Sequence, residues 1–120
     1  MYIYFSGISG AGIAPLAVIA KQAGYDVSGS DKRMSDTITL LNKKGITNIH
    51  IGQETDKIAA IHDSKAIDWL VYSSAVPLEN PNHPELAFAK EHNIKATKRD
   101  QFIADVVQHH NLKMIAIAGT

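Results

Sequence analysis

The sequence predicts an α/β protein built on one parallel β-sheet. Two observations lead to this fold class. Short apolar runs typical of strands alternate with helical patterns along the chain, and the first run leads directly into a glycine-rich turn that opens a helix. Strict alternation favours parallel strands joined by right-handed crossovers, because each crossover helix packs back onto the sheet. We therefore expect a Rossmann-like parallel sheet of five to six strands with helices on both faces.

Each expected element has a local signal. The first strand is Tyr2–Ser6, and Pro15 suits the first turn of the helix that follows, where a missing N–H costs nothing. Gly24 and Gly45 end the first two helices, as glycine does at many helix C-caps. Later strands are expected at 26–29, 48–51, 69–72, 94–97 and 114–118, and later helices at about 36–44, 56–61, 84–91 and 100–109.

The composition bounds the class of protein. A length of 120 residues suits one domain, and 45% hydrophobic with 20% charged residues is ordinary for a globular chain. Twelve basic residues balance twelve acidic ones, so the basic excess of nucleic-acid binders is missing and no nucleic-acid partner is expected. The absence of cysteine excludes disulfides and thiolate chemistry. No apolar run reaches transmembrane length, which favours a cytoplasmic protein without a membrane partner.

The polar residue types do not predict a metal site or a catalytic group. The histidines are scattered, and no two of them have the spacing that would place both on one face of a helix as metal ligands: His50, His62, His83, His92, His109 and His110. No Ser-His-Asp arrangement or carboxylate pair can be inferred either, and Trp69 and Tyr72 are most simply core aromatics.

The glycine-rich turn is the first candidate binding site. Residues 7–12 read G-x-x-G-x-G, which departs from the dinucleotide pattern G-x-G-x-x-G. Glycines allow a ligand to approach the backbone closely, and the N-terminus of the following helix offers unpaired N–H groups with partial positive charge. Binding of a phosphate-containing ligand is therefore favoured over a tight turn without a ligand.

Two further polar clusters follow strands, at Ser28–Asp31 and Ser73–Ala75. Because the carboxyl ends of parallel strands meet at one edge of a sheet, we expect both clusters to lie near the glycine loop. Asp31 can hold ribose hydroxyls or cap the next segment. The serines can donate to phosphate or cap the strand end, and the sequence leaves these alternatives open.

The motifs G-I-S-G-A-G at 7–12, G-S-D at 29–31, S-S-A at 73–75 and A-I-A-G-T at 116–120 together resemble the N-terminal domain of the Mur ligases. The resemblance covers residues 1–120 in order and is greatest to the members that add L-alanine. It implies binding of UDP-N-acetylmuramate by this domain, for peptidoglycan synthesis. It also implies a parent ligase that uses ATP and magnesium, with central ATP-binding and C-terminal domains. The chain is then expected to end where the ATP-binding loop starts, to need no cofactor itself and to bind without catalysing.

The resemblance also implies roles for individual residues. Backbone amides of the glycine loop would cradle the diphosphate, namely those of Gly7, Ile8, Ser9, Gly10, Ala11 and Gly12. Ser30 and Asp31 would meet the uridine end, whereas Ser73, Ser74 and Ala75 would line the diphosphate and sugar. Arg99 would either balance the diphosphate charge or brace the domain.

Two positions depart from the family pattern. Gly52-Gln53 stands where the family usually has Gly-His, so a histidine contact would be lost or replaced. The family's Asn-Pro-Glu-Leu is interrupted between Asn80 and Glu85, as if by a local insertion. Three other interpretations stay open: an NAD(P)-binding domain of an oxidoreductase, the related ligase that recycles muropeptides, and an interaction module without a ligand.

Overall fold

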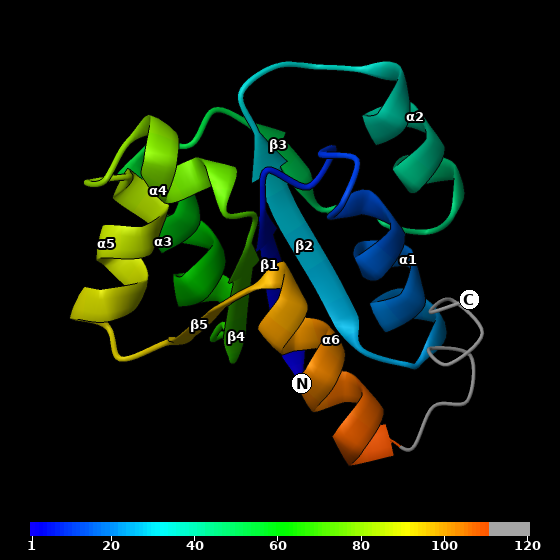
Figure 1. Cartoon of the computed structure of the whole chain (residues 1–120). Helices are drawn as coiled ribbons and strands as arrows, with labels where there is room; N and C mark the ends of the chain where they lie inside the picture. Colours follow the sequence, from blue (N-terminus) through cyan, green and yellow to red (C-terminus); the bar gives the residue numbers. More distant parts are fainter. Residues whose placement is uncertain (111–120) are drawn as a thin grey trace.

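A computed structural model describes residues 1–110 of the chain. One five-stranded sheet, in the order β3-β2-β1-β4-β5, forms the centre of this part of the molecule (Figure 1), and every neighbouring pair is parallel. The strands are β1 (Tyr2–Ser6), β2 (Asp26–Asp31), β3 (Ile49–Ile51), β4 (Trp69–Tyr72) and β5 (Lys95–Lys98). The helices are α1 (Ala14–Gln22), α2 (Asp36–Lys43), α3 (Thr55–Ser64), α4 (Ala75–Glu79), α5 (Pro84–Glu91) and α6 (Arg99–His110).

The expected fold class is confirmed, with differences in detail. The strand expected at 114–118 lies outside the described residues. β2 continues to Asp31, two residues beyond the expected end, because Ser30 and Asp31 pair with β3. No helix was predicted at 75–79, where α4 forms a five-residue helix. The prediction was wrong there because so short a segment shows no periodicity. Pro77 fits in its first turn, where backbone N–H groups lack helical acceptors.

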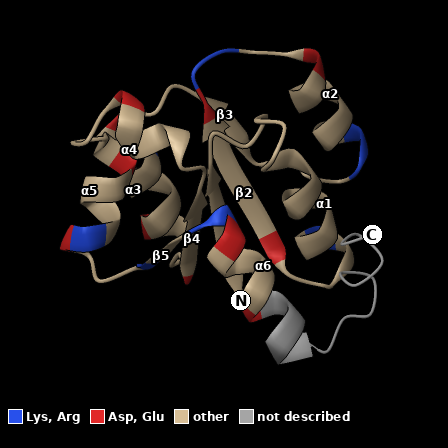
Figure 2. Ribbon diagram, in the orientation of Figure 1, with Lys and Arg blue, Asp and Glu red and all other residues tan. Residues whose placement is uncertain are grey.

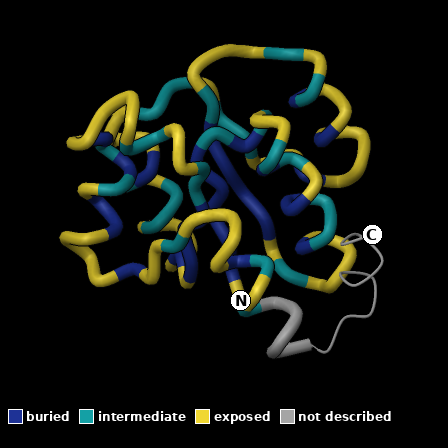
Figure 3. Tube along the Cα trace, in the orientation of Figure 1, coloured by how far each residue is buried: buried dark blue, intermediate teal, exposed yellow. Residues whose placement is uncertain are grey.

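Each face of the sheet carries its own apolar core. Successive side chains of a strand point to opposite faces, so Ile3 and Phe5 lie in one core, whereas Tyr2 and Tyr4 lie in the other. Helices α1, α2 and α6 cover the first face, and α3 and α5 cover the second, with α4 on the same side as α5 (Figure 1). The central strands are consequently buried on both sides (Figure 3), as continuous apolar strands require.

The strand order reverses between β1 and β4, since the chain builds β1, β2 and β3 outward in one direction and then crosses to β4. Connections that leave in opposite directions open a crevice at the carboxyl ends of these two strands. Gly29 allows the glycine loop to pack tightly against β2 beside this crevice. A Cβ atom at Gly29 would lie 2.7 Å from the Phe5 carbonyl oxygen and 2.8 Å from Ile8 Cδ1.

Candidate functional site

Two adjoining pockets lie at the carboxyl ends of the strands, and both are lined by Ser73 and Ala75. The first, here the loop pocket, has a volume of about 210 Å³ and is also lined by Gly7, Ser9, Gly10, Asp31, Lys32, Gln53, Val76, Glu79 and His83. The second, here the Arg99 pocket, has a volume of about 250 Å³ and is also lined by Gly12, Ser74, Lys98, Arg99 and Asp100. The three clusters expected to meet at one sheet edge therefore do meet there.

The glycine loop uses some of its amides internally and leaves others free. Gly10 N donates to Gly7 O at 3.0 Å, and Ile8 N donates to Ser30 O at 2.9 Å. Within residues 1–110, the amides of Gly7, Ala11 and Gly12 have no hydrogen-bond acceptor in the protein. These three amides of the folded loop are therefore the ones available to an anion. The Ile8 side chain, by contrast, is buried in the core.

Arg99 lies directly against Gly12. A Cβ atom at Gly12 would be 3.0 Å from Arg99 Nη1 and 3.1 Å from Arg99 Cδ, so only a glycine leaves the guanidinium in place. The Arg99 side chain is 48% exposed and forms a 3.3 Å ion pair with its more exposed neighbour Asp100. Most of its donors are therefore available to a ligand, in a pocket that is also lined by Gly12, Ser73 and Ser74.

Asp31 lines the loop pocket and holds the glycine loop. Its Oδ2 accepts from Ser9 N at 2.9 Å and from the Ser9 hydroxyl, and its Oδ1 accepts from Lys32 N at 2.8 Å. Both carboxylate oxygens thus have partners inside the protein. Beside it, Lys32 forms a 2.5 Å ion pair with Glu79 of α4, but both side chains are exposed, so the pair adds little stability.

A fully buried carboxylate, Glu85, lies beneath the loop pocket. It accepts hydrogen bonds from the Tyr4 hydroxyl, from Ser6 Oγ at 2.6 Å and from Ser30 Oγ at 2.8 Å. Burial raises the pKa of Glu85 above the usual carboxyl range, although the three hydroxyl donors hold it down in part. Ser30, predicted to meet the uridine end, is therefore directed into this cluster and does not line either pocket.

Sequence reasoning missed Glu85, because an acidic residue in the first turn of α5 is usual at the surface. A signal was present in the strands. Ser6, Ser28 and Ser30 occupy buried positions of β1 and β2, and buried hydroxyls need hydrogen-bond partners. Two of these three serines find Glu85.

The two departures from the family pattern meet in the loop pocket. Gln53 Oε1 lies 3.1 Å from Nε2 of His83, the N-cap residue of α5. An imidazole from another element, that of His83, therefore lies beside position 53 and lines the same pocket. Asn80 belongs to the turn between α4 and α5, where its side chain accepts from Asn82 N at 3.0 Å. It lines neither pocket.

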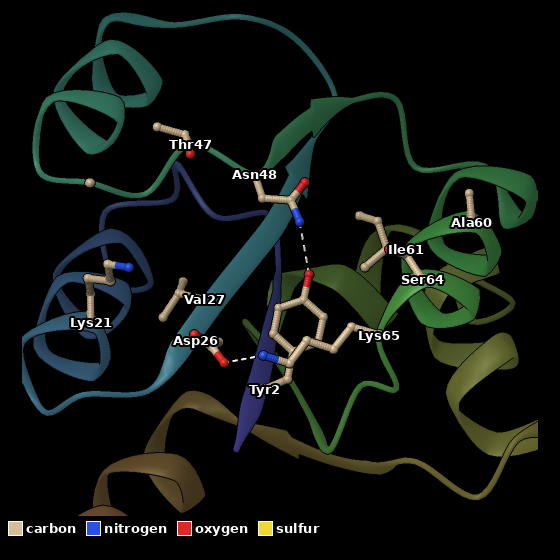
Figure 4. A pocket seen from close by; sticks show the side chains of 11 residues that line it. Tyr2, Lys21, Asp26, Val27, Thr47, Asn48, Ala60, Ile61, Ser64 and Lys65 are labelled. Carbon is tan, nitrogen blue, oxygen red and sulfur yellow. Dashed lines mark hydrogen bonds and ion pairs between the residues drawn. The ribbon is translucent and has the colours of Figure 1, made fainter.

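A larger pocket, of about 480 Å³, lies at the amino ends of β1 and β2 (Figure 4). Its polar side chains pair with one another: Asn48 Nδ2 donates to the Tyr2 hydroxyl at 2.9 Å, and Lys65 pairs with Asp26. Parallel sheets bind ligands at the opposite, carboxyl edge. We therefore place the candidate site in the loop and Arg99 pockets.

Other kinds of site have little support in the described part of the chain. Among residues 1–110, no group of three or more His, Cys, Asp and Glu side chains is arranged to hold a metal ion. None of the helices described is long and apolar enough to cross a membrane. Lysine and arginine residues are spread over several elements on both sides of the sheet (Figure 2), rather than along one face as in many nucleic-acid binders.

Comparison with known proteins agrees with this fold. Residues 2–111 match the family described as "Mur ligase family, catalytic domain". The UDP-N-acetylmuramate–L-alanine ligase of Clostridium novyi is 39% identical over 118 residues, which are 98% of this chain and 23% of that relative. The chain thus spans about a quarter of the length of such relatives.

Two solved structures are also similar. The UDP-N-acetylmuramate–alanine ligase of Thermotoga maritima matches with a TM-score of 0.75 and 25% identity, over 91% of this chain and 23% of its own. The UDP-N-acetylmuramate:L-alanyl-gamma-D-glutamyl-meso-diaminopimelate ligase of Neisseria meningitides matches with a TM-score of 0.74 and 26% identity, over 91% of this chain and 32% of its own. From the family match and these identities, the chain belongs to the Mur ligase family.

Proposed function

We propose that this chain is the UDP-N-acetylmuramate-binding domain of a ligase that adds L-alanine to that sugar nucleotide in peptidoglycan synthesis. The observation that carries the proposal is the unpaired amide of Gly12, which lines one pocket with the Arg99 guanidinium. The names of the relatives support the identity of the ligand and of the reaction.

The diphosphate would occupy the Arg99 pocket. The backbone N–H of Gly12, the Arg99 guanidinium and the hydroxyls of Ser73 and Ser74 are of the kinds that bind phosphate oxygens in proteins. The nucleoside would occupy the loop pocket, beyond Asp31. Since the two pockets share Ser73 and Ala75, one extended ligand can fill both.

The chemistry of the parent would take place outside these residues. On this proposal, the muramoyl carboxylate attacks the terminal phosphoryl group of ATP, with magnesium bound, and releases ADP. The amine of L-alanine then attacks the acyl phosphate and releases phosphate, which leaves an amide. The role of this chain is to hold the sugar nucleotide, so no residue of it is assigned a catalytic role.

A second candidate is the ligase that recycles muropeptides, favoured by the Neisseria meningitides neighbour. The two candidates differ in the amine that is joined to the same sugar nucleotide. An assay of the full-length parent separates them: phosphate release with L-alanine supports the first, and release only with L-alanyl-gamma-D-glutamyl-meso-diaminopimelate supports the second.

Titration of the chain with UDP-N-acetylmuramate, UDP and NAD tests the binding proposal. We expect both uridine ligands to bind and NAD to fail, since the glycine spacing of residues 7–12 departs from the dinucleotide pattern. In NMR spectra, UDP should shift the amide signals of Ala11 and Gly12 more than that of Gly10, whose N–H bonds to Gly7. Binding of NAD alone would support the oxidoreductase interpretation, and binding of none of the three would support a module without a ligand.

A further inference from the structure

Gln53 connects the loop pocket to the buried Glu85 carboxylate. Its side chain is half-buried and lines the pocket together with His83. Gln53 Nε2 donates to Ser30 Oγ at 3.2 Å and to Glu85 Oε1 at 3.4 Å. These two acceptors lie only 2.8 Å apart, so one N–H of the amide is shared between them. The nitrogen end of the amide therefore faces the buried cluster, and the oxygen end is the one that a ligand in the pocket can reach.

The surrounding groups determine this orientation. Glu85 N donates to Nδ1 of His83 at 3.2 Å, so a neutral His83 ring carries its proton on Nε2. That N–H donates to Gln53 Oε1 at 3.1 Å. The flipped amide would place its oxygen against the Glu85 carboxylate and its hydrogens against the imidazole N–H, two repulsive contacts in place of two hydrogen bonds.

The amide oxygen of Gln53 has one lone pair left after accepting from His83. A base that donates an N–H can use this lone pair, as uracil does with N3–H. Cytosine has an acceptor at the same ring atom and would meet the oxygen with a lone pair of its own. The polarity of the pocket is thus set by a carboxylate that no ligand touches.

We propose that Glu85 is a positioning residue that fixes Gln53 as a hydrogen-bond acceptor, and that Gln53 thereby selects uracil over cytosine in the bound nucleotide. The inference rests on the proposed function, because it takes the nucleoside to lie in the loop pocket. It adds a residue-level origin for the choice of base.

The test compares the affinities of UDP and CDP for the wild-type chain and for three variants, by calorimetry. We expect the wild type to prefer UDP at least tenfold, about the value of one hydrogen bond. Glu85→Gln keeps the shape of the side chain but removes the charge that orients Gln53, so the preference should fall toward one. Gln53→Leu should remove the preference by deleting the amide itself, while Glu85 keeps its hydrogen bonds from Tyr4, Ser6 and Ser30.

Tyr4→Phe is the matched control. The Tyr4 hydroxyl donates to Glu85 Oε2, whereas Gln53 contacts Oε1, so this variant should lose stability and keep the preference for UDP. A wild type that binds UDP and CDP equally, or a folded Gln53→Leu that still prefers UDP, would overturn the inference and leave the proposed function standing. Failure of the wild type to bind UDP at all would instead count against the proposed function.

Discussion

At the scale of single residues, Arg99 and Gly12 act together. Gly12 has an ordinary negative φ, so its lack of a side chain matters for space and not for backbone conformation. The space is taken by the Arg99 side chain, whose guanidinium lies beside Gly12 and its free amide. Arginine suits this place because its planar group offers several donors to an oxyanion.

Replacing Arg99 with alanine should weaken UDP binding by about ten- to a hundredfold, the range for a hydrogen bond to a charged group. Calorimetry at two salt concentrations would measure the loss, and the salt dependence of binding should fall with it. Lys65→Ala is the control, because Lys65 lies in the pocket at the amino ends of the strands. Equal affinities for wild type and Arg99→Ala would show that the guanidinium only braces the domain.

Replacing Gly29 with alanine should lower the free energy of unfolding by about 2 kcal/mol or more, as overpacking does in other cores. Its Cβ would meet the Phe5 carbonyl oxygen, a backbone atom, at 2.7 Å and the fully buried Ile8 side chain at 2.8 Å. Urea denaturation measures the loss. Gly10→Ala is the comparison, since its nearest contact is the wider 3.3 Å to Gly7 O, and a larger loss there would contradict the argument.

At the scale of elements, α5 begins with an unusual cap. The first N–H groups of a helix lack helical acceptors, and serine, threonine, aspartate or asparagine commonly supplies one. Here His83 does so, accepting from Glu85 N. The cap therefore works only while the ring is neutral. Burial lowers the pKa of His83, Lys32 lowers it further, and Glu79 opposes both.

This cap makes stability depend on pH. A histidine whose folded pKa lies below its unfolded value of 6.5 contributes fully above that pH, and the contribution is lost as pH falls toward the folded pKa. The pKa of His50 is also lowered, so its contribution to stability is likewise lost as pH falls. The pKa of Glu85 is raised, so its contribution is lost as pH rises. The wild type should therefore lose more stability between pH 7 and 5.5 than His83→Asn, in which asparagine caps α5 at any of these pH values.

Urea denaturation of the two proteins at both pH values isolates the contribution of His83, because His50 and Glu85 are common to both. Parallel curves for the wild type and His83→Asn would show that protonation of this ring does not affect the helix.

At the scale of the whole molecule, the fold could be predicted because it depends on local signals. Alternating elements imply a parallel sheet, and the three polar clusters follow strands whose ends must share an edge. What could not be predicted depends on contacts between distant residues. Glu85 meets Ser6 and Tyr4 about eighty positions away along the chain, and no pattern within α5 indicates it. The sequence also gives no sign of which loop amides bond within the protein, as those of Ile8 and Gly10 do, and which stay free for a ligand.

Because a ligand that binds only the folded chain stabilises it, thermal unfolding tests the site as a whole. UDP-N-acetylmuramate at a hundred times its dissociation constant should add about 2.7 kcal/mol. For a domain of this size, that raises the melting temperature by about 10 °C. NAD at the same concentration should leave the melting temperature unchanged, and an equal rise with both would argue against a site specific for uridine nucleotides.

The tie between Asp31 and Ser9 gives the glycine loop a fixed shape before a ligand arrives. Because the loop already has its fixed conformation, binding of UDP should cost little conformational entropy of the loop. Stopped-flow mixing with UDP should therefore show one concentration-dependent phase. Asp31→Ala removes the hydrogen bonds to Ser9. A second, slower phase should then appear, because the loop must change conformation after the nucleotide binds.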